Sequence, residues 1–176
     1  LLHQEGLKRH PEILDEDIAD PIVIIGNPRT GTTKLQRILG ASAGHQTLPL
    51  WKVLFPFALP AAATEAERMA MARSFQQQIT EQFPDFMAAH PMVADQPEED
   101  SLFMQMSFDF IGALSWFYPA PSYRRMLAGR SQVPAYRYLR SLLQHTQWLD
   151  GGRRGRTWVL KNPLHTGHIA ELAQVF

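Results

Sequence analysis

The fold is decided by the stretch PIVIIGNPRTGTT at residues 21–33. Residues 21–26 are apolar and rich in β-branched side chains, a pattern typical of a strand buried on both faces of a parallel sheet. A turn-rich segment follows. Leu35, Ile38 and Leu39 then share one face of a predicted helix that should stop near Gly44. Strand, glycine-containing loop and helix, in this order, form the context in which a phosphate-binding loop operates.

The loop from Gly26 to Thr33 has the glycine frame of a P-loop. Its turned backbone exposes N–H groups and the helix start adds partial positive charge, so it can bind an anion without side chains. Thr32 replaces the Lys of nucleotide-triphosphate loops, which argues against ATP or GTP as substrate. Arg29 places a cation at a different position within the loop, where it would lie beside the terminal part of an anion that is shorter than a triphosphate. The alternative is a degenerate loop that only turns the chain.

The rest of the chain predicts one more strand, TWVLKN at residues 157–162, and an ambiguous segment at 48–53 that could form a short strand. Four further segments have helical features: a helix opened by a Thr64–Glu67 capping box and ended by Pro84, residues 98–117, a helix opened by Pro134, and residues 165–176. We expect one domain over residues 1–176, with a P-loop-like three-layer α/β fold, a parallel sheet and a mostly helical insertion at 58–150. Two strands are few for such a sheet, so we expect it to be incomplete on its C-terminal side.

Composition excludes several classes of protein. Seventeen basic and seventeen acidic residues cancel, which gives no reason to expect nucleic-acid binding. The chain has no cysteine, so it has neither disulfides nor thiolate metal sites, and we expect a cytoplasmic protein. No apolar run approaches the length of a membrane span.

The loop PRTGTT after an apolar strand resembles the 5′-phosphosulfate loop of sulfotransferases that use 3′-phosphoadenosine-5′-phosphosulfate, in their bacterial-type branch. RHPEILDEDIADPIVIIG, LPLW, PEED, PAYRYL and WVLKNPLH resemble landmarks of the same family, in the same order, over roughly residues 8–176. Lys52 departs from the acid that follows Trp in the family. The resemblance implies that the donor is bound by one set of loop residues: Pro28, Arg29, Thr30, Gly31, Thr32 and Thr33.

Sulfuryl transfer parallels phosphoryl transfer, in which positioning and charge stabilisation dominate, and it demands no metal. Arg29 is the candidate to face the sulfate or bridging oxygens, and the resemblance directs Lys161 at the leaving group. The base stays open between Glu99, or its neighbour Glu98, and His165. The plainer alternative is that the acids only complement a helix dipole. His165 and His168 could form a metal pair, but no third ligand is evident.

The aromatic-rich insertion favours a hydrophobic small-molecule or lipid acceptor, and the oligomeric state is left open. Two other functions remain. A P-loop kinase would need a Lys at position 32 and an acidic Mg²⁺ ligand, and a non-catalytic nucleotide-binding module would keep the fold alone. The resemblance implies that the site for the donor's 3′-phosphate lies beyond Phe176.

Overall fold

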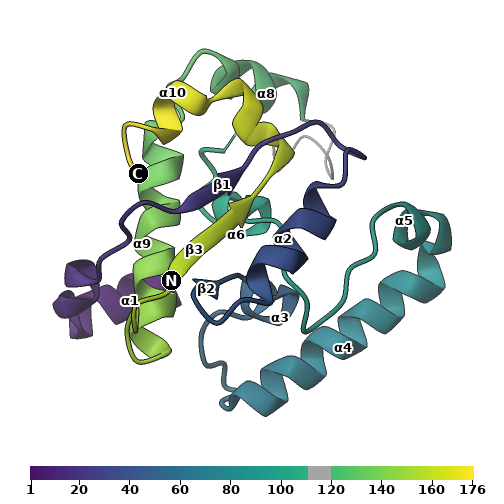
Figure 1. The fold of residues 1–176 in the computed structure, drawn as a ribbon, viewed down its shortest axis with the longest axis horizontal. Coiled ribbons are helices and arrows are strands. Elements are labelled where there is room, and N and C mark those ends of the chain that lie inside the picture. Colours follow the sequence, from purple (N-terminus) through teal and green to yellow (C-terminus); the bar gives the residue numbers. More distant parts are fainter. Residues whose placement is uncertain (111–119) are drawn as a thin grey trace.

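The structure is a computed structural model that describes residues 1–110 and 120–176. Its sheet has three parallel strands in the order β1-β3-β2 (Figure 1). These are β1 (Ile22–Ile24), β2 (His45–Gln46) and β3 (Thr157–Lys161). The two strands predicted from apolar runs are confirmed as β1 and β3. Strand β2 was not predicted, because two residues carry no periodicity.

The helices of the described residues lie around this sheet. They are α1 (Leu2–Arg9), α2 (Thr32–Gly40), α3 (Leu50–Leu54), α4 (Glu65–Gln82), α5 (Pro84–Ala89), α6 (Ser101–Gln105), α8 (Pro121–Ala128), α9 (Val133–Leu149) and α10 (Ile169–Leu172), with the 3₁₀ helices η1 (Pro11–Asp15) and η2 (Pro163–Gly167). The strands β1 and β3 lie beside α9 in Figure 1. The side chains of Trp158 and Leu160 on β3 share a buried apolar core with Tyr136, Leu139 and Leu143 of α9.

Three helix boundaries follow from the predicted end signals. Thr64 and Glu67 form the expected capping box, with each side chain bonded to the backbone of the other. Helix α4 ends at Gln82, just before Pro84, which cannot continue it. Pro134 lies in the first turn of α9, where its missing N–H costs nothing.

The hypothesis of a strand at residues 48–53 is wrong, since residues 50–54 form the helix α3. Pro49 precedes the helix in an extended conformation. Leu50 and Val53, three residues apart, are both fully buried. An apolar segment this short reads equally well as strand or helix, and tertiary packing decides between them.

The predicted helix at residues 98–117 is also wrong in length, since α6 covers only Ser101–Gln105. The hydroxyl of Ser107 donates to the carbonyl of Met104 and accepts from the N–H of Asp109, so it competes with the helical ladder. Phe108 then adopts a left-handed conformation with φ 57°. Residues 111–117 of this prediction lie outside the described residues.

Helix α2 is shorter than predicted and turns a different face inward. It ends at Gly40. Leu35 and Ile38 of the predicted apolar face are exposed, while Gln36 is buried. The buried amide donates to the carbonyl of Glu98 over 3.1 Å. A polar contact therefore ties α2 to the segment that carries the acids.

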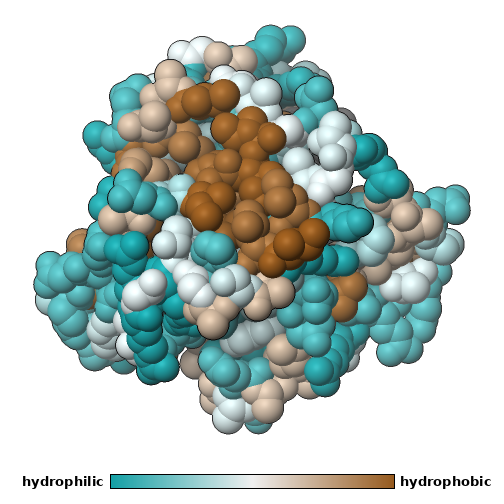
Figure 2. Space-filling model, in the orientation of Figure 1, coloured by the Kyte–Doolittle hydropathy of each residue, from teal (hydrophilic) through white to brown (hydrophobic). Residues whose placement is uncertain are grey.

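Apolar surface gathers over β1 and the end of β3 (Figure 2). Ile22 and Ile25, at the two ends of β1, are both more than a third exposed. Within the described residues, β1 pairs with β3 on one side alone. None of the helices in the described ranges is both long and apolar enough to cross a bilayer.

Candidate functional site

A cavity of about 1190 Å³ opens beside α2, α5 and the end of β3. It brings together most of the residues that the sequence singled out: Pro28, Arg29, Gly31, Thr32, Thr33, Glu98, Glu99 and Lys161. Lys34, Arg37 and His90 add further polar groups to its wall. The remaining wall is largely apolar, with Ile38, Ala41, Phe86, Met92, Leu102 and Leu164 among its residues. A charged end and an apolar wall thus share one space.

The phosphate loop is shaped by two residues in the left-handed region. Gly31 has φ 89° and stands directly before α2. Arg29 has φ 68°, a strained conformation for a residue with a Cβ, and such strain clusters at functional sites. The hydroxyl of Thr30 donates to the carbonyl of Asn27 over 2.7 Å and braces the turn. The first N–H groups of α2, which have no partner within the helix, therefore start at this loop.

Arg29 also connects the loop to the far wall of the cavity. Its guanidinium donates to the carbonyl of Ala89, the last residue of α5. Arg37 of α2 donates to the carbonyl of Pro91 over 3.3 Å. In Figure 1, α4 and α5 form an arm from which the chain returns to the sheet. Two arginines thus hold the end of this arm against the phosphate-loop side.

The acidic segment is held in place by its backbone. The N–H of Glu98 donates to the carbonyl of Leu48 over 2.8 Å, and the N–H of Asp100 donates to the carbonyl of Lys161 over 3.3 Å. Glu99 lies between these anchors, and its Oε1 accepts from Lys161 Nζ over 2.6 Å. The Lys161 side chain is 2% exposed and that of Glu99 20%. The sequence placed these two residues in one site, and the structure brings them into contact.

Glu98 has a partner that the sequence analysis missed. Its Oε1 lies 3.2 Å from Nε2 of His90 and also accepts from the N–H of Glu99 over 2.8 Å. The hydrogen bond to Glu98 raises the pKa of His90, against the opposing effect of burial. Burial acts to raise the pKa of Glu98, but the bond and charge of His90 outweigh it, so that this pKa is lowered. The pair therefore favours an imidazolium beside a carboxylate.

His165 is not brought to the cavity. Its side chain is fully buried, with Nε2 3.1 Å from Asp100 Oδ2 and Nδ1 3.0 Å from the hydroxyl of Tyr136. Asn162 donates to the other oxygen of Asp100 over 3.2 Å. Both ring nitrogens of His165 are thus used inside the protein, behind the acids that face the cavity.

One cluster has the spacing of metal ligands. Ligand atoms of His90, Glu98 and Glu99 all lie within 4.8 Å of one another. The ammonium of Lys161 already pairs with Glu99, and His90 already pairs with Glu98. Two acids and two bases thus satisfy each other here, so we interpret the group as a charge-paired cluster. His168, the second residue of the other candidate metal pair, is bonded to Glu171 over 2.7 Å instead.

Lys52, which departs from the family pattern, does not line the cavity. It pairs with Asp150 and lies over the ring of Trp51, 5.3 Å from its centroid. The departure therefore changes a contact between α3 and the end of α9, away from the phosphate loop.

His90 and the cations Lys34 and Arg37 were missed as parts of the site. Lys34 and Arg37 lie one turn apart on α2, so they share one face of the helix that follows the predicted loop. That spacing could have predicted both as parts of a site beside the start of the helix. His90 gave no such signal, since it reaches Glu98 only because the chain returns from α5 along the phosphate loop.

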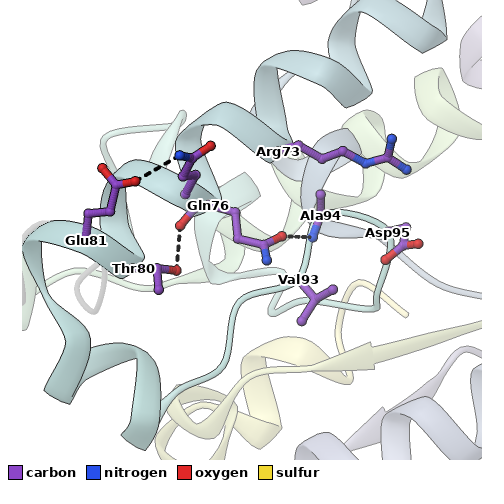
Figure 3. Close-up of a pocket in the computed structure, with 8 residues that line it drawn as sticks. Arg73, Gln76, Thr80, Glu81, Val93, Ala94 and Asp95 are labelled. Atoms are coloured by element: carbon purple, nitrogen blue, oxygen red, sulfur yellow. Dashed lines mark hydrogen bonds between the residues drawn. The ribbon is translucent and has the colours of Figure 1, made fainter.

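A smaller depression of about 480 Å³ lies between α4 and residues 93–95 (Figure 3). Gln76 reaches from α4 and accepts from the N–H of Ala94 over 2.9 Å. None of the candidate donor-binding or catalytic residues lines it. The contact of Gln76 with Ala94 ties α4 to the segment that leads to Glu98.

Comparison with known proteins identifies the family of the chain. The family model described as "Sulfotransferase family" matches residues 21–176. Among solved structures, sulfotransferase STF1 from Mycobacterium tuberculosis H37Rv is 30% identical with a TM-score of 0.71, and sulfotransferase STF9 from Mycobacterium avium is 28% identical with a TM-score of 0.77. The match covers 100% and 99% of this chain but 48% and 44% of theirs, so the chain spans about half their length. No curated protein matches it. Because the family model spans most of its length, the chain belongs to the sulfotransferase family.

Proposed function

We propose that this protein transfers a sulfuryl group from 3′-phosphoadenosine-5′-phosphosulfate to a hydroxyl of an apolar small-molecule or lipid acceptor. One observation carries the proposal. A single cavity is lined by the phosphate loop, by the Lys161–Glu99 pair and by an apolar wall. Donor, transferred group and acceptor each find a matching surface there.

The donor's 5′ end suits the loop. Residues Thr30 to Thr33 lead into α2, whose positive N-terminal end and free N–H groups favour a bound anion. The hydroxyls of Thr32 and Thr33 can donate to the same oxygens. Lys34 and Arg37 add positive charge to the wall.

The pair at the end of β3 suits the transfer itself. In the proposed reaction the acceptor oxygen bonds to sulfur while the bond from sulfur to the bridging phosphate oxygen breaks. The electrons of that bond leave with 3′-phosphoadenosine-5′-phosphate, and the acceptor's proton passes to Glu99. Lys161, now bonded to Glu99, is placed to turn its charge to the leaving oxygen, and Arg29 is the second candidate for that charge. Glu99 is preferred to His165 as base because Glu99 lines the cavity.

The acceptor side is apolar. Phe86 and Met92 come from α5 and the segment after it, and Ile38 comes from α2. Leu102 comes from α6 and Leu164 from η2. Ile38 is 60% exposed and Phe86 42%, so both present apolar surface in the wall of the cavity. An apolar alcohol, phenol or lipid would cover them, whereas a polyanionic sugar would not.

Calorimetry tests the donor site. We expect 3′-phosphoadenosine-5′-phosphate to bind without Mg²⁺, whereas Mg²⁺-dependent ATP binding would indicate a kinase. Gly31→Val should abolish binding, because φ 89° strains any residue with a Cβ even though the space there is open. Gly129→Val is the matched control, since its surroundings are equally open and its φ is −92°. Equal affinity in both variants would refute the loop's role.

Mass spectrometry tests the transfer. Incubation with donor should add about 80 mass units, the mass of SO₃, to an apolar alcohol or phenol in an acceptor panel. Retained nucleotide binding with no transfer to any acceptor or to water would indicate the non-catalytic module instead.

A further inference from the structure

His90 is a titratable side chain of the cavity wall to which the proposed reaction gives no task. It directly follows α5, and its ring is half-buried, with 35% of the side chain exposed. Its neighbours Ala89 and Pro91 are held by Arg29 and Arg37 through their carbonyls. The ring is therefore carried by backbone that is fixed to the phosphate-loop side.

A chain of contacts leads from this ring to the proposed base. His90 Nε2 contacts Glu98 Oε1, and the same oxygen accepts from the N–H of Glu99. The Glu99 carboxylate then meets Lys161. Glu98 is 6% exposed, so water cannot replace a lost partner. The orientation of Glu99 thus depends on a carboxylate that one imidazole holds.

We propose that His90 is a positioning residue for sulfuryl transfer, which acts through Glu98 to hold Glu99 and Lys161 in register and is effective only while its imidazole is protonated. The proposal rests on the proposed function of the same cavity. Glu98, Glu99 and Lys161 are the titratable groups whose charges act on His90, and Arg29 and Arg37 hold the backbone on either side of it. When His90 is protonated, the carboxylates of Glu98 and Glu99 are balanced by two cations, His90 and Lys161.

Loss of that proton has a defined consequence. Glu98 becomes a buried carboxylate without a cationic partner beside a second carboxylate, and like charges at this distance repel. Lys161 is then drawn between two acids, which loosens its contact with Glu99. Turnover should therefore fall as pH rises through the pKa of His90, which is raised above its ordinary value.

Kinetics with His90→Gln tests this, because Gln can still donate to Glu98 but cannot carry charge or titrate. The readout is release of 3′-phosphoadenosine-5′-phosphate from the donor, with water or a simple phenol as acceptor. We expect kcat to fall roughly tenfold, the donor KM to stay within about twofold, and the alkaline decline of kcat near the pKa of His90 to disappear. His10→Gln is the matched control, because His10 contacts Glu12 over 3.1 Å at a distant, exposed site.

An unchanged kcat and pH profile in His90→Gln would overturn the proposal, and a raised donor KM with normal kcat would make His90 a donor ligand instead. Proton resonances of the His90 ring provide a measurement that needs no turnover. The pKa of His90 should lie above the ~6.5 of a peptide histidine and should fall in Glu98→Gln. A His90 that titrates at or below that value refutes the positioning role, whereas failure of the nucleotide to bind refutes the proposed function itself.

Discussion

Two acid–imidazole pairs lie on either side of Glu99, and they differ chiefly in what surrounds them. Asp100 and His165 are 1% and 0% exposed, and the second ring nitrogen of His165 is bonded to Tyr136. Glu98 is also buried, but its partner His90 lines the cavity. The pair of Asp100 and His165 thus holds the chain just after β3, whereas the pair of Glu98 and His90 faces the candidate active site. We infer that the pair with the buried imidazole is structural and that the pair with the cavity-lining imidazole is the functional one.

The largest expected effect is on the fully buried pair of Asp100 and His165, called the sealed pair below. Asp100→Ala should lower the free energy of unfolding by about 4 kcal/mol, because it leaves Asn162 and His165 buried without their acceptor. Urea denaturation measures this loss. His90→Ala should cost less, about 2 kcal/mol by the same measurement, because the buried Glu98 loses one partner but keeps the N–H of Glu99 as a donor. Equal losses in the two variants would remove the distinction.

The next effect concerns the cations between the pairs. Arg29→Ala and Lys161→Ala should each lower single-turnover rates by about 100-fold or more while donor affinity changes less, because both cations are proposed to act on charge that grows in the transition state. Lys52→Ala is the control, since it removes another lysine–carboxylate pair far from the cavity. If donor affinity alone falls, the two residues bind the donor and do not take part in the chemistry.

Glu99→Gln and His165→Ala, compared side by side, separate the two candidate bases. Glu99→Gln should lower kcat by about 100-fold, the usual scale for a general base, and should lower the melting temperature less than His165→Ala, because the Gln oxygen can still accept from Lys161. His165→Ala should lower the melting temperature first, since both of its nitrogens are bonded inside the protein. Normal turnover in Glu99→Gln would exclude it as the base.

The part of this site that the sequence could predict is the part built from local pattern. The apolar run before Gly26 and the run that ends at Lys161 predicted strands, because burial on both faces of a sheet leaves a continuous apolar signature. The turn between β1 and α2 was likewise predicted from its local glycine spacing, and its role in binding phosphate stays a prediction.

The parts that failed depend on tertiary contacts. Residues 50–54 form a helix because the core buries Leu50 and Val53, and α6 stops at Gln105, shortly before Phe108 takes a backbone angle that no sequence rule assigns to Phe. The contact of His90 with Glu98 needs the whole return of the chain from α5. His165 looked available because it follows Lys161 by four residues, but the chain turns it inward onto Asp100.

A third imidazole site extends the comparison, because it has no acid. His3 Nδ1 lies 3.0 Å from His145 Nδ1, and burial with the nearby charge of His145 lowers the pKa of His3 to about 4. Between pH 6.5 and 4 the unfolded chain binds more protons at His3 than the folded one, so stability falls as pH falls. The loss should be about 2 kcal/mol between pH 7 and pH 5. His90 acts in the opposite sense, since its raised pKa favours the folded state at low pH and that contribution is lost as pH rises through its folded pKa.

Urea denaturation at a series of pH values measures the His3 effect. His3→Gln should flatten the decline between pH 6.5 and 5, while His90→Gln should leave it in place. A decline that persists unchanged in His3→Gln would place its cause elsewhere.

The smallest expected effect tests whether the arm that carries His90 is held independently of the sealed pair. Thr64→Ala removes the cap of α4, in which Thr64 accepts from the N–H of Glu67 over 3.2 Å and Glu67 accepts from the N–H of Thr64 over 2.8 Å. The cost should be about 1 kcal/mol in the free energy of unfolding. Thr80→Ala is the matched control, because the hydroxyl of Thr80 bonds within the same helix to the carbonyl of Gln76 and its loss should be neutral. Hydrogen exchange should show faster opening at the start of α4 in Thr64→Ala, with β3 and α9 unchanged, because α4 packs mainly against α3 and α5. Faster exchange in β3 as well would mean that the arm and the sheet unfold as one unit. The stability of the Glu98–His90 pair could not then change independently of that of the Asp100–His165 pair.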